Sequence, residues 1–457
     1  MTDRVLIVDF GSQVTQLIAR RVREMGVYCE IHPFNKVTAE SIEYFGPQGV
    51  ILSGGPASVS DPDGPTIPPV VLELGVPILG ICYGVQSLIH RHGGGVTPSD
   101  TREFGRAEVS LLPSAPGTTD LFSRIRDAGP TTTVWMSHSD RIDTLPEDFK
   151  VTARTENGVI AAVAHTHRPI FGVQFHPEVV HTTQGKALID AFLFDSCKLS
   201  PSWTAANFVE ESCASIREKV GPHERVILGL SGGVDSSVAA LLLHRAIGDR
   251  LQCIFVDNGL MRRDEGREVV ATFRDHYRIP LRAVDASERF LEALKGITDP
   301  EEKRRRIGHV FVEIFEAEAS TVDGARWLAQ GTLYPDVIES QSFRGPSATI
   351  KTHHNVGGLP EDMALGLIEP LRELFKDEVR AVGISCGLPD EMVWRQPFPG
   401  PGLAVRILGE VTPERVKLLQ EADAIVREEL EASREALVRA AEEQAAAAAA
   451  WAAKHAG

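Results

Sequence analysis

The sequence predicts an α/β protein of two domains, each with a mainly parallel sheet covered by helices, followed by a helical C-terminal tail. Three observations lead to this prediction. Short β-branched, apolar runs typical of buried strands occur in both halves of the chain and are followed by helix-prone segments. The chain has 457 residues, which is long for a single domain. From residue 413 onward no strand-like pattern returns.

In the first half, buried strands are expected at residues 4–10, 49–53 and 76–81. An amphipathic helix is expected over residues 13–26, directly after the first strand. Between residues 107 and 175 apolar and polar residues alternate, which indicates a more antiparallel part of the same domain.

In the second half, a helix is expected over residues 204–220, and strands at 225–228, 251–257 and 327–331. Residues 413–454 are helix-prone throughout and include six consecutive alanines. Alanine has the highest helix propensity but little side chain to bury, so this tail is expected to be a solvated helix or a partly disordered segment.

A short polar stretch follows residue 197, and the composition changes again after residue 402. We therefore expect a first domain at residues 1–197, a second at 198–402 and a tail at 403–457.

The charge balance bounds the partners of the protein. The sequence has 47 Lys and Arg against 63 Asp and Glu, a net charge of −16, which argues against general binding to nucleic acid or to an anionic membrane. Its six cysteines lack metal-like spacing, and no secretory or membrane-spanning segment is evident. A cytoplasmic location is expected.

The turn at residues 231–237 joins a strand to a helix and has the composition of a pyrophosphate cradle. Gly232 and Gly233 permit a close backbone approach, and the helix N-terminus presents N–H groups to an anion. Asp235 would repel a polyphosphate unless a cation lay between them, so it argues for Mg²⁺. The alternative is a tight turn with an N-cap cluster.

Cys82 lies between an apolar strand and a helix, as in a nucleophile elbow, where the helix N-terminus favours the thiolate. His176 and Glu178 would point to one face of an extended strand, so that Glu178 orients His176 as general base. The alternative is an ordinary buried cysteine. Backbone N–H groups for an oxyanion hole are expected from Gly54, Gly55 and Tyr83.

These residues resemble known families. Gly80-Ile81-Cys82-Tyr83-Gly84 and Phe175-His176-Pro177-Glu178 are similar to class I glutamine amidotransferases, and the turn at 231–237 resembles the PP-loop of ATP pyrophosphatase domains. From residue 5 to 423 the chain resembles the glutamine-hydrolysing GMP synthase family. The further segments that match this family in order are 9–13, 135–138, 256–260, 330–336, 353–359 and 397–402.

The resemblance implies a ligase of GMP biosynthesis whose substrates are glutamine, ATP and xanthosine 5′-monophosphate (XMP), with Mg²⁺. Cys82 would release ammonia from glutamine through a thioester. ATP would adenylate XMP, and ammonia would then displace AMP to give GMP, with pyrophosphate as the other product.

The resemblance also implies binding residues. Arg304 would contact XMP, and Asp235 and Asp336 would hold metal. Without the family, a core residue is the better interpretation of Val256, and solvated surface charges are the better interpretation of Lys376 and Lys351. On spacing alone, Asp336 fits a helix N-cap equally well. The residues expected to bind ATP are Ser231, Gly232, Gly233, Val234, Asp235, Ser236, Ser237, Val256, Gly331 and Lys376.

The family is homodimeric, but its C-terminal dimerisation domain, which also contributes to the XMP site, has no counterpart after residue 425. One alternative is therefore a form that keeps glutaminase activity and ATP binding but has impaired XMP amination, or a non-catalytic interaction protein. Another is a different glutamine-dependent ligase, such as an NAD or asparagine synthetase-like enzyme. ATP consumption that depends on XMP would distinguish GMP synthesis from both.

Overall fold

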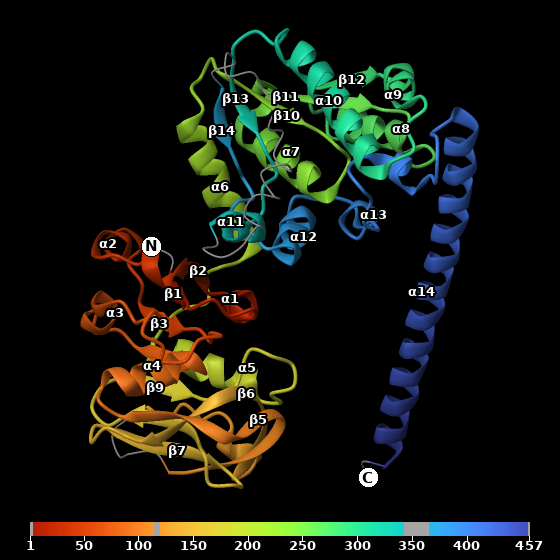
Figure 1. Ribbon diagram of the computed structural model, residues 1–457. Helices are drawn as coiled ribbons and strands as arrows, with labels where there is room; N and C mark the ends of the chain where they lie inside the picture. Colours follow the sequence, from red (N-terminus) through yellow and green to blue (C-terminus); the bar gives the residue numbers. More distant parts are fainter. Residues whose placement is uncertain (1–2, 114–118, 342–364, 456–457) are drawn as a thin grey trace. The chain divides into compact units, whose positions relative to one another are not determined.

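The computed structural model describes residues 3–113, 119–341 and 365–455. The described residues form two compact units (Figure 1). The first contains the described residues up to 208 together with 338–341, and the second contains residues 209–337 and 365–455. The predicted domain limits at residues 197 and 402 stay predictions.

The first unit contains a nine-stranded mixed sheet with the order β2-β1-β3-β4-β9-β8-β7-β5-β6. Neighbouring strands from β2 to β9 pair in parallel, and those from β9 to β6 pair antiparallel, as the alternating pattern between residues 107 and 175 indicates. The strands are β1 (Arg4–Asp9), β2 (Tyr28–Pro33), β3 (Gly49–Leu52), β4 (Ile78–Ile81), β5 (Gly95–Leu111), β6 (Thr131–Thr144), β7 (Phe149–Thr155), β8 (Ile160–His165) and β9 (Ile170–Val173).

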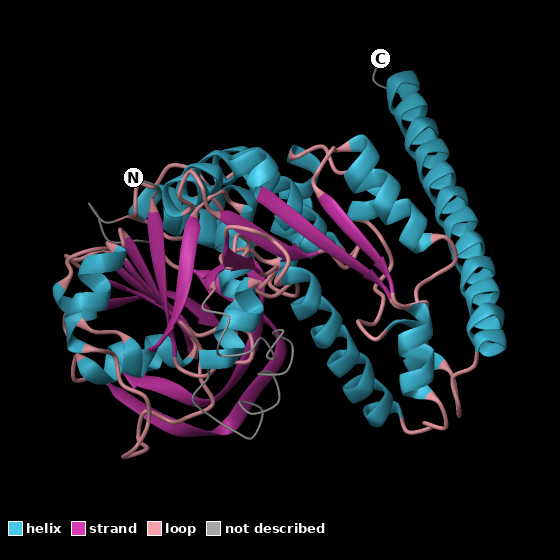
Figure 2. Cartoon of the chain, turned by 90° about the horizontal axis from the view of Figure 1, so that it is seen from above, coloured by secondary structure: helices cyan, strands magenta, loops and turns pink. Residues whose placement is uncertain are grey.

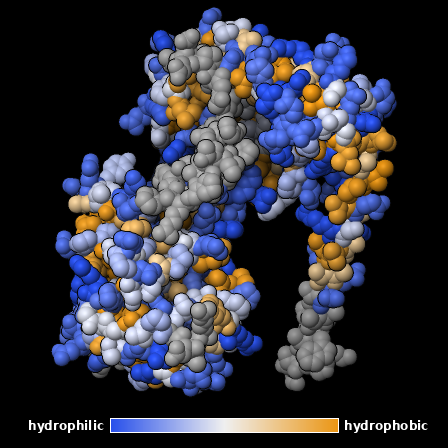
Figure 3. Space-filling view, viewed as in Figure 1, coloured by the Kyte–Doolittle hydropathy of each residue, from blue (hydrophilic) through white to orange (hydrophobic). Residues whose placement is uncertain are grey.

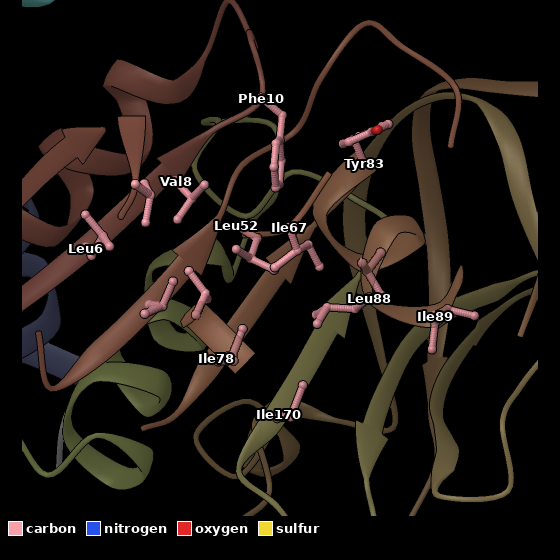
Figure 4. Packing of buried hydrophobic residues seen from close by; sticks show 14 of the residues in the cluster. Leu6, Val8, Phe10, Leu52, Ile67, Ile78, Tyr83, Leu88, Ile89 and Ile170 are labelled. Atoms are coloured by element: carbon pink, nitrogen blue, oxygen red, sulfur yellow. The ribbon is translucent and has the colours of Figure 1, made fainter. Parts of the chain in front are cut away.

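Helices cover this sheet because their apolar faces pack on its β-branched side chains. Figure 4 shows this core, in which Val8, Leu52 and Ile78 from the strands meet Leu88 of α4. The helices are α1 (Thr15–Glu24), α2 (Ala39–Phe45), α3 (Pro69–Glu73), α4 (Tyr83–Arg91) and α5 (Gly185–Asp190), with shorter helical segments η1 (Phe34–Lys36), η2 (Arg126–Ala128) and η3 (Ala191–Ser196).

The second unit contains a five-stranded sheet, β12-β11-β10-β13-β14, in which every neighbouring pair is parallel. β10 has the next strand of the chain on one side and β13 on the other, so the strand order reverses at its carboxyl end, where ligands of such sheets bind. The strands are β10 (Arg225–Gly229), β11 (Leu251–Asp257), β12 (Leu281–Asp285), β13 (Ala325–Ala329) and β14 (Gly366–Ile368).

Helices join the strands of this sheet along the chain, and Figure 2 shows the helices in cyan and the strands in magenta. The helices are α6 (Ala205–Lys219), α7 (Val234–Ile247), α8 (Glu265–Val270), α9 (Ser287–Leu294), α10 (Pro300–Ala319), α11 (Tyr334–Gln341), α12 (Lys376–Ser385), α13 (Asp390–Val393) and α14 (Pro413–His455), with η4 (Gly248–Arg250), η5 (Ala271–His276) and η8 (Gly402–Arg406). The predicted α/β fold class is confirmed. No helix of the described residues is long and apolar enough to span a membrane.

The tail predicted from residue 413 is one helix, α14. Asp423 holds its N-terminal part, because this half-buried carboxylate lies 3.1 Å from Nε of Arg262 and 3.0 Å from Nη1 of Arg406. It also lies 3.0 Å from Nε of Arg427 on the same helix. Further along, α14 exposes apolar side chains, seen as orange atoms in Figure 3 and including Leu430 and Leu437.

Candidate functional site

Cys82 lies between β4 and α4 in a strained backbone conformation, with φ 52° and ψ −109°. A positive φ is uncommon for a residue with a side chain and marks a position that the surrounding fold enforces. Glycine on both sides allows the sharp turn: a Cβ at Gly84 would lie 2.4 Å from the carbonyl oxygen of Leu52, and one at Gly80 2.7 Å from the nitrogen of Val85. This is the geometry of a nucleophile elbow.

His176 connects Cys82 to Glu178. Its Nδ1 lies 2.7 Å from Oε1 of Glu178, and the ring is also hydrogen-bonded to Cys82. Burial alone lowers the pKa of His176, but the hydrogen bonds to Cys82 and Glu178 and their charges outweigh this effect and raise the pKa to about 10. The three side chains predicted as a triad therefore meet in the buried arrangement that nucleophilic catalysis requires.

The backbone that carries the imidazole is fixed from two sides. The N–H of His176 donates to the carbonyl of Trp135 at 3.0 Å, and its carbonyl accepts from the hydroxyl of Thr182 at 2.6 Å. His176 itself lies in the turn after β9, and these two hydrogen bonds tie that turn to β6 and to the segment before α5.

The glycines predicted for the oxyanion hole lie beside this group. A Cβ at Gly54 would lie 3.3 Å from Cε1 of His176 and 3.7 Å from Cβ of Cys82, and one at Gly55 would lie 3.3 Å from Cγ of Tyr83. A side chain at Gly54 would occupy the space beside Cys82 and His176, and one at Gly55 the space beside Tyr83. The backbone is therefore free to approach a bound substrate there.

Two buried glutamines at this centre were not predicted as site residues. Nε2 of Gln174 lies 3.8 Å from Sγ of Cys82, and Oε1 of Gln174 accepts from Nε2 of Gln86 at 3.3 Å. Gln86 could have been found from spacing, because it lies one helical turn after Cys82. Gln174 lies just beyond the end of β9, and nothing in its spacing indicates Cys82.

The glycine-rich turn at residues 231–237 lies at the carboxyl end of β10 and begins α7. Gly232 has φ +75°, and the hydroxyls of Ser231 and Ser236 lie 3.0 Å apart. The hydroxyl of Ser237 donates to the carbonyl of Gly233 at 2.8 Å. Backbone N–H groups, hydroxyls and a helix N-terminus thus converge at the switch point of the sheet.

Asp235 and Lys376 lie 141 positions apart in the sequence but form an ion pair beside the turn, with Nζ 2.6 Å from both carboxylate oxygens. A Cβ at Gly331 would lie 3.4 Å from Cβ of Asp235, so this glycine belongs to the same group. The ion pair places one anionic and one cationic side chain at the edge of the glycine-rich turn.

The remaining predicted residues lie apart from the turn or in local contacts. Val256 is buried in the core of the second unit. Asp336 is the third residue of α11, and its Oδ2 accepts from the N–H of Leu333, the residue before the helix, at 3.4 Å. It caps the start of the helix from inside the first turn and is not itself the N-cap residue. Arg304 is exposed and pairs with Glu301 at 3.3 Å. Lys351 lies outside the described residues.

Lys303, which precedes Arg304, is the buried residue of the basic run at residues 303–306. Lys303 is fully buried, and its Nζ donates to the carbonyl of Ile407 at 2.7 Å and to that of Ala404 at 3.3 Å. It anchors α10 to η8. Sequence alone could not distinguish this structural lysine from the three arginines that follow it.

Comparison with known proteins gives two family matches and many close relatives. Residues 6–196 match the family described as glutamine amidotransferase class-I, and residues 208–299 match the family described as NAD synthase. The chain is 57% identical over 429 residues to the GMP synthase [glutamine-hydrolyzing] of Phenylobacterium zucineum, covering 94% of this chain and 81% of that protein. Identity is 55% to that of Brachyspira hyodysenteriae and 56% to that of Solidesulfovibrio magneticus, with 94% of this chain and 82% of each protein covered.

Proposed function

The chain belongs to the glutamine-hydrolysing GMP synthases, and on this basis we propose how its two sites divide the reaction. The enzyme is a ligase that forms GMP with nitrogen taken from glutamine. The observation that carries this conclusion is the identity of 57% over 94% of the chain, together with a thiol centre and a phosphate turn in the two matched parts.

At the first site, Sγ of Cys82 attacks the side-chain amide carbon of glutamine. His176 transfers a proton to the leaving nitrogen, ammonia departs, and a γ-glutamyl thioester remains, which water hydrolyses to glutamate. Glu178 orients and polarises the imidazole, as its 2.7 Å contact with Nδ1 supports. The negative charge that develops on the amide oxygen is stabilised by the backbone N–H groups of Gly54, Gly55 and Tyr83.

At the second site, the turn from Ser231 to Ser237, with Val234 at the start of α7, binds the β- and γ-phosphates of ATP. These phosphates leave as pyrophosphate when the O2 oxygen of XMP attacks the α-phosphorus. Mg²⁺ supplied with ATP would neutralise charge on the departing pyrophosphate, and the carboxylate of Asp235 fits this cation because Mg²⁺ binds ATP through one or two carboxylates. Ammonia then displaces AMP from the adenylated base, giving GMP.

The ion pair of Asp235 and Lys376 suggests how this site responds to its substrate. With the carboxylate engaged by the cation, the ammonium of Lys376 becomes available to the phosphates. The remaining assignments are part of the proposal: Gly331 and Val256 line the nucleotide site, Asp336 is a second metal ligand, and Arg304 exchanges Glu301 for the phosphate of XMP.

Two broader assignments belong to the proposal. The family that the chain resembles is homodimeric, and light scattering in solution would test whether this chain forms a dimer without a counterpart of the family's dimerisation domain. A cytoplasmic location is supported by the six free cysteines. The relatives found do not favour a non-catalytic protein or an NAD-forming ligase, because matches to GMP synthases over 94% of the chain cover both sites.

The test is GMP formation from XMP, ATP and Mg²⁺, with either glutamine or ammonium as nitrogen donor. We expect the wild-type enzyme to use both donors and Cys82→Ala to use only ammonium, because the thiol is needed only to release ammonia. ATP hydrolysis that does not depend on XMP, or equal loss of both activities in Cys82→Ala, would contradict the assignment.

A further inference from the structure

Arg395 reaches the phosphate turn from the segment between α13 and η8. Its Nη1 donates to the carbonyl oxygen of Gly232 at 2.7 Å, and its Nη2 forms an ion pair with Glu265. We propose that Arg395 is a positioning residue of the synthetase reaction, which holds the peptide between Gly232 and Gly233 in the orientation that ATP requires. This inference rests on the proposed ATP site.

The peptide that Arg395 contacts has little intrinsic preference for one orientation. It joins two glycines, and Gly232 has φ +75°, so a rotation of the peptide plane meets little steric resistance. In a trans peptide the carbonyl and the next N–H point in opposite directions. A contact that fixes the carbonyl of Gly232 therefore also fixes the direction of the N–H of Gly233.

That N–H points into the turn, where it lies 3.3 Å from Oγ of Ser231. With the carbonyl held by Arg395, the face of the turn offers donors to the phosphates. A reversed peptide would present a carbonyl oxygen to the same phosphates, and two groups of partial or full negative charge repel each other. The guanidinium therefore acts through the backbone rather than by touching ATP.

Arg395 is itself held by a set of reciprocal contacts. Glu265 is buried, and its second oxygen accepts from the N–H of Arg262 at 3.0 Å. The guanidinium of Arg262 donates to the carbonyls of Gln396 and Pro397 at 3.2 and 3.4 Å. Arg262 thus holds both Glu265, the counterion of Arg395, and the segment directly after Arg395. This limits the positions available to the Arg395 side chain.

The turn is tightly packed at Gly232, where the guanidinium of Arg395 reaches it. A Cβ at Gly232 would lie 2.7 Å from Cγ2 of Val269 on α8 and 3.4 Å from Nη1 of Arg395. The turn is therefore in close contact with α8 on the side where the guanidinium enters. A planar, forked donor can reach a carbonyl and a carboxylate together, whereas an ammonium is a single point charge.

The experiment measures kcat and KM of ammonia-dependent GMP synthesis in the full chain, separately for ATP and XMP, in Arg395→Met, Arg395→Lys and Glu265→Gln. Arg395→Met is expected to lose about 10- to 100-fold in kcat/KM for ATP, as for removal of one fixed donor from an active site. KM for XMP stays within about twofold, because the positioned peptide serves the phosphates of ATP alone. For Arg395→Lys and Glu265→Gln we expect values of kcat/KM for ATP between those of Arg395→Met and wild type.

Arg380 offers a matched control, because its guanidinium lies 5.1 Å from the ring centroid of Trp394, beside the same segment. Arg380→Met removes a neighbouring cation without touching the turn, and its kcat/KM for ATP should stay within about twofold of wild type. A purely structural role of Arg395 would change the melting temperature and affect ATP and XMP alike. The positioning role predicts a selective effect on ATP.

The inference is overturned if Arg395→Met keeps the kcat/KM of wild type for ATP. It is also overturned if the KM for XMP changes as much as the KM for ATP, or if Arg380→Met loses as much kcat/KM for ATP as Arg395→Met does. Should Arg395→Met not fold, Arg395→Lys decides: a selective loss for ATP supports the role, and unchanged kinetics overturn it. Wild-type GMP synthesis is measured first. Failure of the proposed function would therefore appear in the unmodified enzyme, and failure of this inference only in the variants.

Discussion

Glu178→Gln is the most direct test of the first site, because it removes one charge and keeps the shape of the side chain. In the structure, Oε1 of Glu178 lies 2.7 Å from Nδ1 of His176 in a buried setting. The variant should destabilise the protonated form of His176, because an amide lacks the negative charge that stabilises an imidazolium.

The magnitude follows from the pKa of His176, which rises from 6.5 to about 10. That change corresponds to about 5 kcal/mol of differential interaction, at 1.36 kcal/mol for each tenfold change in proton affinity. Cys82 and Glu178 share this effect. Removing the charge of Glu178 should therefore cost about 2 kcal/mol and lower the proton affinity of His176 by a factor of about 30.

The assay is glutamate release from glutamine as a function of pH. We expect kcat to fall by at least a factor of about 30, and the alkaline limb of the profile, where His176 loses its proton, to move to lower pH. Glu156→Gln is a suitable control, because Glu156 is exposed in the turn between β7 and β8. An unchanged alkaline limb in Glu178→Gln would refute the role of Glu178.

Stability gives a second measurement with a defined sign. The pKa of His176 in the folded protein lies above its unfolded value, so its contribution is fully present below about pH 6.5 and is lost as the pH rises through about 10. The difference in unfolding free energy between wild type and Glu178→Gln should accordingly be largest near pH 6 and narrow toward pH 10. A difference that widens over this range would contradict the assignment.

Two further predictions concern the elbow and the second site. Gly84→Ala places a Cβ 2.4 Å from the carbonyl oxygen of Leu52 and should cost about 3 kcal/mol in chemical denaturation together with the glutaminase activity; a loss under about 1 kcal/mol would contradict the close approach. Lys376→Met removes the partner of Asp235 and should lower kcat/KM for ATP about 100-fold in ammonia-dependent synthesis, whereas unchanged kinetics would exclude Lys376 from phosphate binding.

The sequence was most informative where the chemistry is local. His176 and Glu178 are two positions apart and meet as predicted, but they lie in the turn that follows β9 and not on the extended strand that the prediction assumed. The turn at residues 231–237 is likewise continuous, and the types and order of its residues are enough to indicate an anion site.

Contacts between distant residues could not be predicted in the same way. Gln174 lies 92 positions from Cys82, and Arg395 lies 163 positions from Gly232. Nothing in the spacing of either residue indicates its partner, because the topology of the sheet brings them together. The sequence also could not decide between the metal-ligand and N-cap interpretations of Asp336, since both place a carboxylate at the first turn of a helix.

Because α14 is held near its start, the position of each later residue follows from helix geometry. The ion pairs of Asp423 with Arg262 and Arg406, which lie outside α14, hold the helix at one point, and Arg427 of the same helix adds a third. Each residue beyond it advances the chain by about 1.5 Å and turns it by about 100°. Spin labels at surface positions such as Glu431 and Glu435 would therefore have distances that a straight helix predicts. A measured distance that differs from this prediction would show where the helix bends.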